Sequence, residues 1–210
     1  IIVSDIMMPE MNGITMCKIL KEDVRTSHIP IILLTAKDSL QDKEEGYQVG
    51  ADSYLTKPFS ATLLHSRINN LLESRKRLTE RFNTSTPHHN MDEKRALLAE
   101  SLNKLDNEFI EKINQLIEAR LSSEKIDIGY LADNMCMSKS TLYRKMKALT
   151  GLSTNEYVRK IKMQHAERLL LEGRYNISEV AFRVGINSVV YFRQCFKEEF
   201  GVLPSEYLKQ

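Results

Sequence analysis

The sequence predicts two regions of different fold class, an α/β region followed by an all-α region. Three observations support this division. Aliphatic runs alternate with helical patterns up to about residue 82, which is typical of strand–helix–strand units around a parallel sheet. From Met91 onward no strand-like alternation persists. Within this second region the chain repeats one pattern, first at Ile128–Gly151 and again at Ile177–Gly201.

Three apolar runs are predicted to form the parallel strands of the first region, at residues 1–3, 29–35 and 51–56. Near-continuous apolar sequence such as IPIILLT is typical of a strand that is covered on both faces. Helices are predicted between and after these strands, at residues 14–21, 38–49 and from 59 to about 81. The last helix places one apolar stripe on a single face, formed by Leu63, Leu64, Ile68, Leu71 and Leu72.

A polar stretch without periodicity, NTSTPHHN at residues 83–90, is predicted to be a linker. Its adjacent His88 and His89 are not expected to bind a metal ion, because no Cys or carboxylate stands at ligand spacing. Two helices are predicted after it, at residues 93–101 and 106–121. The predicted domains are therefore 1–82, a linker and connecting helix at 83–101, and an all-α domain at 102–210.

Each copy of the repeat is predicted to form a short helix, a tight turn and a second helix. Apolar positions of the first copy fall on apolar positions of the second, and both copies end in glycine after a helical run. The copies are joined by a predicted helix at Thr154–Leu171, which at ~1.5 Å per residue is about 27 Å long. Rigidly joined, the two second helices could lie about 34 Å apart, one turn of B-DNA.

Basic residues are concentrated around the repeat. From Met135 to Lys197 there are twelve Lys and Arg residues and four Glu residues, a local net charge of +8. This asymmetry indicates a polyanionic partner, although a solvated basic face is the alternative. In a helix-turn-helix, exposed side chains of the second helix meet base edges and phosphates. The predicted DNA-contacting residues are Lys139, Ser140, Tyr143, Arg144 and Lys147 in the first copy, and Val189, Val190, Arg193, Gln194 and Lys197 in the second.

Chemistry suggests a role for several of these side chains. Arg144 can bind guanine with two hydrogen bonds, and Gln194 can do the same with adenine. Lys139 and Lys147 suit phosphates. Val189 and Val190 could meet thymine methyl groups, and packing on a partner subunit is the alternative for this exposed pair.

Polar residues also gather at the predicted carboxyl ends of the strands, where open α/β sheets place their chemistry. Asp5 follows the first strand, Thr35 ends the second, and Tyr54 and Lys57 belong to the third. An Asp nucleophile with a hydroxyl and an ammonium beside it could accept a phosphoryl group. On spacing alone, the alternative that Asp5 caps a loop and Lys57 is solvated stays open.

The stretches SDIMMPEMNG, IILLTA and ADSYLTKPF resemble, in this order, the second half of a two-component receiver domain, over residues 1–77. The resemblance implies that Asp5 is the phosphoacceptor and that Lys57 binds the phosphoryl group, with a cis Lys57–Pro58 bond. It makes Thr35 and Tyr54 the switch residues. It also implies a Mg²⁺ site to which Asp5 and the backbone carbonyl of Met7 contribute.

The chain departs from the receiver pattern in one respect. A complete receiver is flavodoxin-like, with strand order 2-1-3-4-5, and its first strand ends in an acidic pair that completes the metal site; no residue here matches that pair. We therefore expect an incomplete half-domain, with an exposed apolar edge at residues 1–5 and a tendency to self-associate. We expect neither Mg²⁺ nor a phosphoryl group or beryllofluoride to bind at Asp5 in this chain with useful affinity.

Residues 109–208 resemble the AraC-type DNA-binding domain, through LADNMCMSKSTLYRKMKALTG, AERLL and EVAFRVGINSVVYFRQCFKEEFGVLPSEY. The implied partner is double-stranded DNA, contacted in two adjacent major grooves, and a homodimer is expected. By this resemblance Ser140, Tyr143 and Arg144 contact bases. The order of the two domains is similar to the C-terminal end of hybrid two-component regulators of gut Bacteroidetes. There, sensor, histidine kinase and transcription factor share one membrane-anchored chain, with the output part in the cytoplasm.

Other function classes find less support in the sequence. There is no Ser/His/Asp set, Gly-rich phosphate loop or metal cluster, so neither an enzyme nor a small-molecule substrate is expected. No apolar run approaches the ~20 residues that a membrane span needs. Cys17, Cys136 and Cys195 are far apart and are expected to be reduced core thiols. A signalling or dimerisation module whose helical domain binds protein remains the alternative to a DNA-binding regulator.

Overall fold

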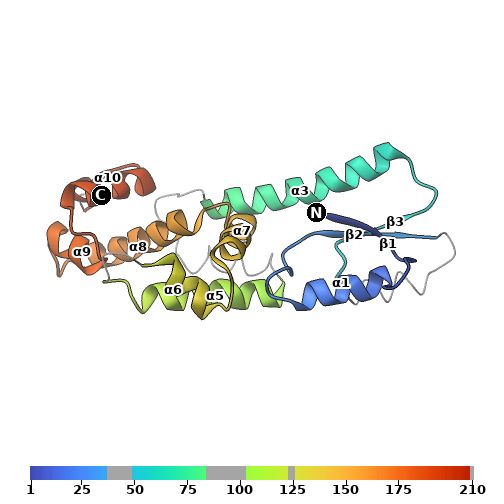
Figure 1. Ribbon diagram of the computed structural model, residues 1–210. Coiled ribbons are helices and arrows are strands. Elements are labelled where there is room, and N and C mark those ends of the chain that lie inside the picture. The colour runs from blue at the N-terminus through green and yellow to red at the C-terminus, as the bar shows by residue number, and fades with distance from the viewer. Residues whose placement is uncertain (37–48, 84–102, 123–125, 209–210) are drawn as a thin grey trace.

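The computed structural model describes residues 1–36, 49–83, 103–122 and 126–208. The molecule is elongated, with the α/β region at one end and the last helices at the other (Figure 1). The predicted helix at 93–101, nearly all of the predicted helix at 38–49, and the linker with His88 and His89 lie outside the described residues.

Three strands form the predicted parallel sheet, in the order β1-β2-β3: β1 (Ile2–Asp5), β2 (Ile31–Thr35) and β3 (Ser53–Thr56). Ile2 lies opposite Ile31 in the first pair, and Ile32 lies opposite Ser53 in the second. The central strand is the most buried, as its aliphatic sequence predicts. β1 is an edge strand, and its residue Val3 is 38% exposed. The expected apolar edge is therefore present.

Two helices accompany the sheet among the described residues, α1 (Gly13–Glu22) and α3 (Ala61–Asn83). The Asn12 side chain caps α1 by accepting a hydrogen bond from the Ile14 amide at 2.7 Å. The apolar stripe of α3 is only partly covered, since Leu63 and Leu72 are 44% and 48% exposed. The described part of the sheet thus leaves some apolar side chains of this long helix in contact with solvent.

Residues 103–208 are helical, as predicted, with these bounds: α5 (Lys104–Glu118), α6 (Ile128–Asn134), α7 (Lys139–Thr150), α8 (Thr154–Leu171), α9 (Ile177–Arg183), α10 (Val189–Phe200) and α11 (Pro204–Tyr207). The two copies of the repeat match closely: α6 and α9 each have 7 residues, and α7 and α10 each have 12. Ser138 and Ser188 cap the second helices, and Gly151 and Gly201 end them with φ of 74° and 79°.

The helix α8 belongs to two separate hydrophobic cores. Its first half contributes Tyr157, Val158 and Ile161 to the core of the first copy, which also contains α5, α6 and α7. Its second half contributes Met163, Ala166 and Leu170 to the core of the second copy. A helix that is buried on most sides along its length is held firmly by both ends. The two helix-turn-helix motifs are therefore joined by a rigid element.

The cysteines are free thiols, and one of them differs from expectation. Cys17 and Cys195 lie in cores, as predicted, with exposures of 0% and 2%. Cys136 is exposed instead. It stands in the turn between α6 and α7 with a positive φ of 52°, where the chain reverses at the surface. The prediction of a core thiol was wrong at this position because the apolar pattern pauses in the turn.

Candidate nucleic-acid interface and phosphoacceptor site

The helix α7 presents one polar face to solvent, and that face carries all five predicted contact residues of the first copy. The opposite face, with Leu142, Met146 and Leu149, is buried in the first core. The 3.6-residue period produces this division, because positions three and four apart share a face. The Ser138 hydroxyl caps the start of the helix by accepting from the Thr141 amide at 3.1 Å. The Arg144 Nε donates to the Ser140 carbonyl at 3.4 Å.

The helix α10 presents a similar face with two differences. Val190 is 77% exposed, and Arg193, Gln194 and Lys197 are exposed, but Val189 is half-buried. The Gln194 amide donates to a carboxylate oxygen of Glu198 at 3.1 Å, one turn further along the helix. Base contact by Gln194 therefore requires its amide to exchange this partner for an adenine.

Three of the twelve Lys and Arg residues between Met135 and Lys197 are buried, which counting charges along the sequence could not show. Lys160 pairs with Glu199 at 3.3 Å, and Lys162 donates to the Gly185 carbonyl at 3.2 Å. Lys145 is 0% exposed and pairs with Asp106. Asp106 and Glu199 lie outside the segment that was counted. The exposed positive surface is thus smaller than +8 and is concentrated on the outer faces of the helices.

Lys145 and Asp106 form a buried network with Ser27 of the α/β region. The Lys145 ammonium donates to the Ser27 hydroxyl at 2.9 Å, and that hydroxyl donates to the Asp106 carboxylate at 2.7 Å. The Asn103 side-chain amide donates to the Ser27 carbonyl at 3.3 Å. Burial lowers the pKa of the Lys145 ammonium, and the hydrogen bond to Asp106 opposes that shift. The sequence analysis missed this network.

The helical spacing of the sequence could have indicated the buried Lys145–Asp106 pair. Lys145 stands three residues after Leu142 and four before Leu149, so it falls on the apolar stripe of its helix. Asp106 stands three residues before Phe109 and lies on the buried face of α5. A charged residue within an apolar stripe is rarely buried without a partner. Two such residues of opposite charge on neighbouring helices indicate an internal ion pair.

At the carboxyl ends of the strands, Asp5 and Lys57 lie together as predicted. The Lys57 ammonium is 2.6 Å from a carboxylate oxygen of Asp5, and both side chains are about half exposed. The Lys57–Pro58 peptide bond is cis, as the receiver resemblance implies. Thr35 and Tyr54 are buried, and the Thr35 hydroxyl donates to the Ala36 carbonyl at 3.2 Å.

The loop after Asp5 is fixed by the glycine at its end. The Gly13 amide donates to the Ile6 carbonyl at 2.8 Å. A Cβ atom on Gly13 would lie 2.2 Å from the Asp5 carbonyl oxygen, far inside van der Waals contact. Only glycine therefore lets the start of α1 approach the backbone of the acidic residue this closely.

The described residues supply few ligands for the implied Mg²⁺. Asp5 offers one carboxylate, which already pairs with Lys57, and Met7 offers a backbone carbonyl. The described part of the chain contains no group of three or more His, Cys, Asp or Glu side chains that could hold a metal ion. Mg²⁺ demands near-ideal octahedral coordination by oxygen. These residues alone do not fit that requirement.

Comparison with known families assigns both halves of the chain. Residues 1–69 match the family described as response regulator receiver domain, and residues 131–210 match the family described as helix-turn-helix domain. The chain joins a receiver domain to an AraC-type helix-turn-helix domain. Neither family is enzymatic. Among the described residues, no helix is long and apolar enough to cross a membrane.

Individual proteins resemble the whole chain or part of it. The chain is 36% identical over 207 residues to histidine kinase P4 of Formosa agariphila, a match that covers 99% of the chain and 15% of that protein. The C-terminal domain of AraT, a response regulator from Geobacillus stearothermophilus, is 31% identical over 48% of this chain and 84% of that one, with a TM-score of 0.45. The DNA-binding domain of AdpA, solved in complex with a target DNA, is 30% identical over 48% of this chain and 89% of that one, with a TM-score of 0.44.

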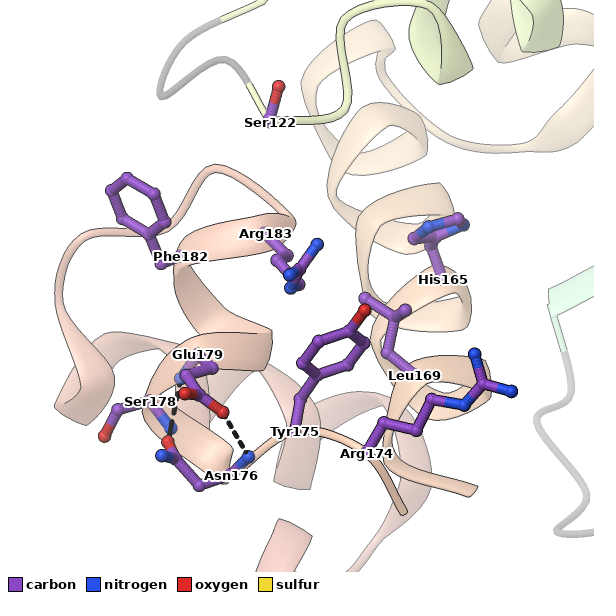
Figure 2. A pocket seen from close by; sticks show the side chains of 10 residues that line it. All are labelled: Ser122, His165, Leu169, Arg174, Tyr175, Asn176, Ser178, Glu179, Phe182 and Arg183. Carbon is purple, nitrogen blue, oxygen red and sulfur yellow. Dashed lines mark hydrogen bonds between the residues drawn. The ribbon is translucent and has the colours of Figure 1, made fainter. Parts of the chain in front are cut away.

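The helix-turn-helix domain also has a cavity of about 820 Å³ between α8, α9 and Ser122 (Figure 2). The Arg183 guanidinium lies over the Tyr175 ring, 3.8 Å from its centroid. The Glu179 carboxylate caps α9 by accepting from the Asn176 amide at 2.8 Å. None of the residues that line this cavity was predicted from the sequence to have a functional role.

Proposed function

We propose that the chain is a sequence-specific DNA-binding transcription regulator and forms the output end of a two-component phosphorelay. The observation that carries this proposal is the pair of matching motifs, each with an exposed polar face on its second helix. Because α8 is anchored in both cores, the two faces can act together on one DNA duplex. Two adjacent major grooves are the expected binding surface.

Within the first motif, Arg144 and Tyr143 with Ser140 are the proposed base contacts, and Lys139 and Lys147 are the proposed phosphate contacts. All five side chains are exposed on α7. A guanidinium that donates two parallel hydrogen bonds distinguishes guanine, whereas an ammonium neutralises phosphate without regard to sequence. In the second motif, Val189 and Val190 with Arg193 and Gln194 are the proposed base contacts, and Lys197 is a proposed phosphate contact.

Replacing Arg144 by Ala is expected to weaken binding to the preferred site by about 1–3 kcal/mol and to relax discrimination at one base pair. The loss arises because an apolar side chain cannot satisfy both acceptors of a guanine edge. Selection of bound sequences from a random DNA pool, followed by titration of single-base variants, would measure both effects. Lys147→Ala is the matched control on the same face: it should weaken all sequences alike and lower the salt slope by about 0.9.

An equal loss on every sequence in the Arg144 variant would mean that Arg144 contacts phosphate. The assignment of base contact to Arg144 would then be wrong, while DNA binding itself would stand. Binding that is insensitive to salt would instead argue against DNA as the partner, because so many Lys and Arg side chains must displace counterions from the duplex.

The receiver half is the proposed input. We propose domain limits of 1–82 for the receiver, 83–101 for the connection and 102–210 for the output domain. Asp5 is the proposed phosphoacceptor, Lys57 the group that neutralises the phosphoryl oxygens, and Thr35 and Tyr54 the switch residues. A histidine kinase domain in the same full-length chain is the proposed donor, and a homodimer is the proposed DNA-bound form.

This chain is expected not to incorporate a phosphoryl group at Asp5 when it is incubated with Mg²⁺ and acetyl phosphate. The described residues contain no group of three or more His, Cys, Asp or Glu side chains that could hold the metal, so the charge of the incoming group is poorly neutralised. Mass spectrometry of the intact protein would measure incorporation. A chain joined at its N-terminus to the first two strands and helices of a complete receiver should be labelled, and its Asp5→Asn variant should not. Stoichiometric labelling of the present chain would contradict the expectation.

One observation favours a second candidate function, a protein-binding module. Phe182 on α9 and Val190 on α10 are 70% and 77% exposed, and exposed apolar side chains can mark a protein interface. In that case Val190→Ser would abolish association with the protein partner, and the wild-type chain would show no salt-dependent binding to DNA. We place this candidate second because α7 and α10 also expose basic residues, Lys139, Arg144 and Lys147 on the first and Arg193 and Lys197 on the second.

A further inference from the structure

The receiver and the first helix-turn-helix motif are packed against each other in this chain. The helix α3 extends from the sheet toward the second region and contacts α7 (Figure 1). The loop after α1, residues 23–28, reaches the same place: Val24 packs against the first core, and Ser27 is 0% exposed. Arg75 of α3 donates a hydrogen bond to the carbonyl of His28 in this loop. We call this contact region, formed by residues 23–28 and α3 against α5 and α7, the domain interface.

Lys145 occupies the centre of the domain interface. It belongs to the helix proposed to enter the major groove, yet its side chain is 0% exposed, whereas Arg144 and Lys147 beside it are exposed. Its ammonium pairs with Asp106 of α5 and lies 4.9 Å from the centre of the Phe109 ring. Contact with a phosphate would require the ammonium to leave these partners and to strand a carboxylate that is 2% exposed.

Ser27 is the receiver's group in this network. Its hydroxyl both accepts from Lys145 and donates to Asp106, so it bridges the two charges. Its carbonyl accepts from Asn103, whose side chain also caps α5 by accepting from the Asp106 amide at 2.9 Å. A shift of the loop would therefore break hydrogen bonds on both helices at once.

From this geometry we propose that Lys145 is a positioning residue that locks the recognition helix α7 to the receiver through Ser27. The inference rests on the proposed DNA-binding function and adds a physical route by which the receiver sets the orientation of the base-contacting face. A movement of the loop at residues 23–28 changes the hydrogen bonds of Lys145, and Lys145 is part of α7. The first motif then distinguishes bases well only while the receiver holds the loop in place.

Ser27→Ala in the whole chain tests the route with a small change that lies outside the helix-turn-helix domain. Loss of the bridging hydroxyl should speed amide hydrogen exchange in residues 142–150 about fivefold, since its hydrogen bonds to Lys145 and Asp106 are both lost from the anchor of this helix while the direct Lys145–Asp106 pair remains. Discrimination between the selected first half-site and its single-base variants should fall by a similar factor. Ser66→Ala, which removes an exposed hydroxyl from α3, is the control and should change neither measurement.

Lys145→Met, compared with Lys147→Met, separates positioning from phosphate contact. The salt slope should stay at its wild-type value in the Lys145 variant and fall by about 0.9 in the Lys147 variant. A lowered slope for Lys145→Met, or unchanged exchange in α7 of Ser27→Ala, would overturn the proposal. If Lys145→Met does not fold, the Ser27 exchange result decides. Wild-type chain that binds all DNA sequences equally would refute the proposed function, and the exchange measurement would still decide the proposal about the domain interface.

Discussion

Replacing Asp106 by Ala is expected to lower the free energy of unfolding by about 3–5 kcal/mol, the cost of stranding one member of a buried ion pair. The Lys145 ammonium would keep only the Ser27 hydroxyl and the face of Phe109 as partners, within a core where it is 0% exposed. Burial already lowers the pKa of this lysine, so part of the penalty would appear as its deprotonation. Urea unfolding followed by circular dichroism would measure the loss.

Two further variants test whether the stranded charge causes this loss of stability. Glu108→Ala breaks the Lys104–Glu108 pair on the same helix, whose side chains are 89% and 56% exposed, and should cost less than about 1 kcal/mol. The double variant Asp106→Leu with Lys145→Met removes both charges and should recover most of the stability lost in Asp106→Ala. A double variant as unstable as Asp106→Ala would show that packing around the pair, and not the stranded charge, accounts for the loss.

The chain is also expected to lose roughly 3 kcal/mol of stability through His28 as the pH falls from 6.5 to 4. His28 is 8% exposed, and burial lowers its pKa to about 4, with the nearby Lys145 ammonium adding to the shift. Arg75 and Lys21 also oppose a positive charge there, and Asp106 favours one. In this pH window the unfolded chain binds a proton that the folded chain excludes. The stability that the neutral His28 side chain contributes to the folded state is therefore complete above pH 6.5 and is lost as the pH falls toward 4.

His28→Gln isolates this contribution from the carboxylates, which titrate in the same window. The measured quantity is the difference in unfolding free energy between pH 7 and pH 4.5, in the wild type and in the variant. The drop should be smaller in His28→Gln. His65→Gln, which alters an exposed histidine on α3, should keep the wild-type drop. Equal drops in wild type and His28→Gln would show that His28 is not buried as neutral imidazole.

The helix-turn-helix pair and the sheet could be predicted from sequence because their signals are local. Serine before each second helix and glycine after it mark the helix ends, and the period of apolar residues marks the buried face. For Asp5 and Lys57, strand ends that meet at one edge of a parallel sheet left two readings open, and the resemblance to a receiver domain favoured the pair that the structure shows. The proposed DNA contacts on these helices remain predictions at the level of single residues.

The domain interface could not be predicted in the same way, because it depends on residues far apart in sequence. Ser27 and Lys145 are brought together by packing between two domains, and nothing in the sequence around Ser27 indicates burial. Lys145 was counted as one more positive charge, although its position in the apolar stripe pointed inward. How far the apolar stripe of α3 is covered could not be predicted for the related reason that tertiary cover depends on which other elements are present.

The helix α8 also sets how the two motifs are oriented relative to each other. Each residue of a helix advances it by ~1.5 Å and rotates it by about 100°, so inserting one residue in α8 would turn the second motif by more than a quarter of a turn. Inserting four would restore its direction to within about 40° and lengthen the span by ~6 Å, close to two base-pair steps. In the proposed complex with DNA, the length of this one helix would therefore decide which spacings of half-sites the two motifs can contact together.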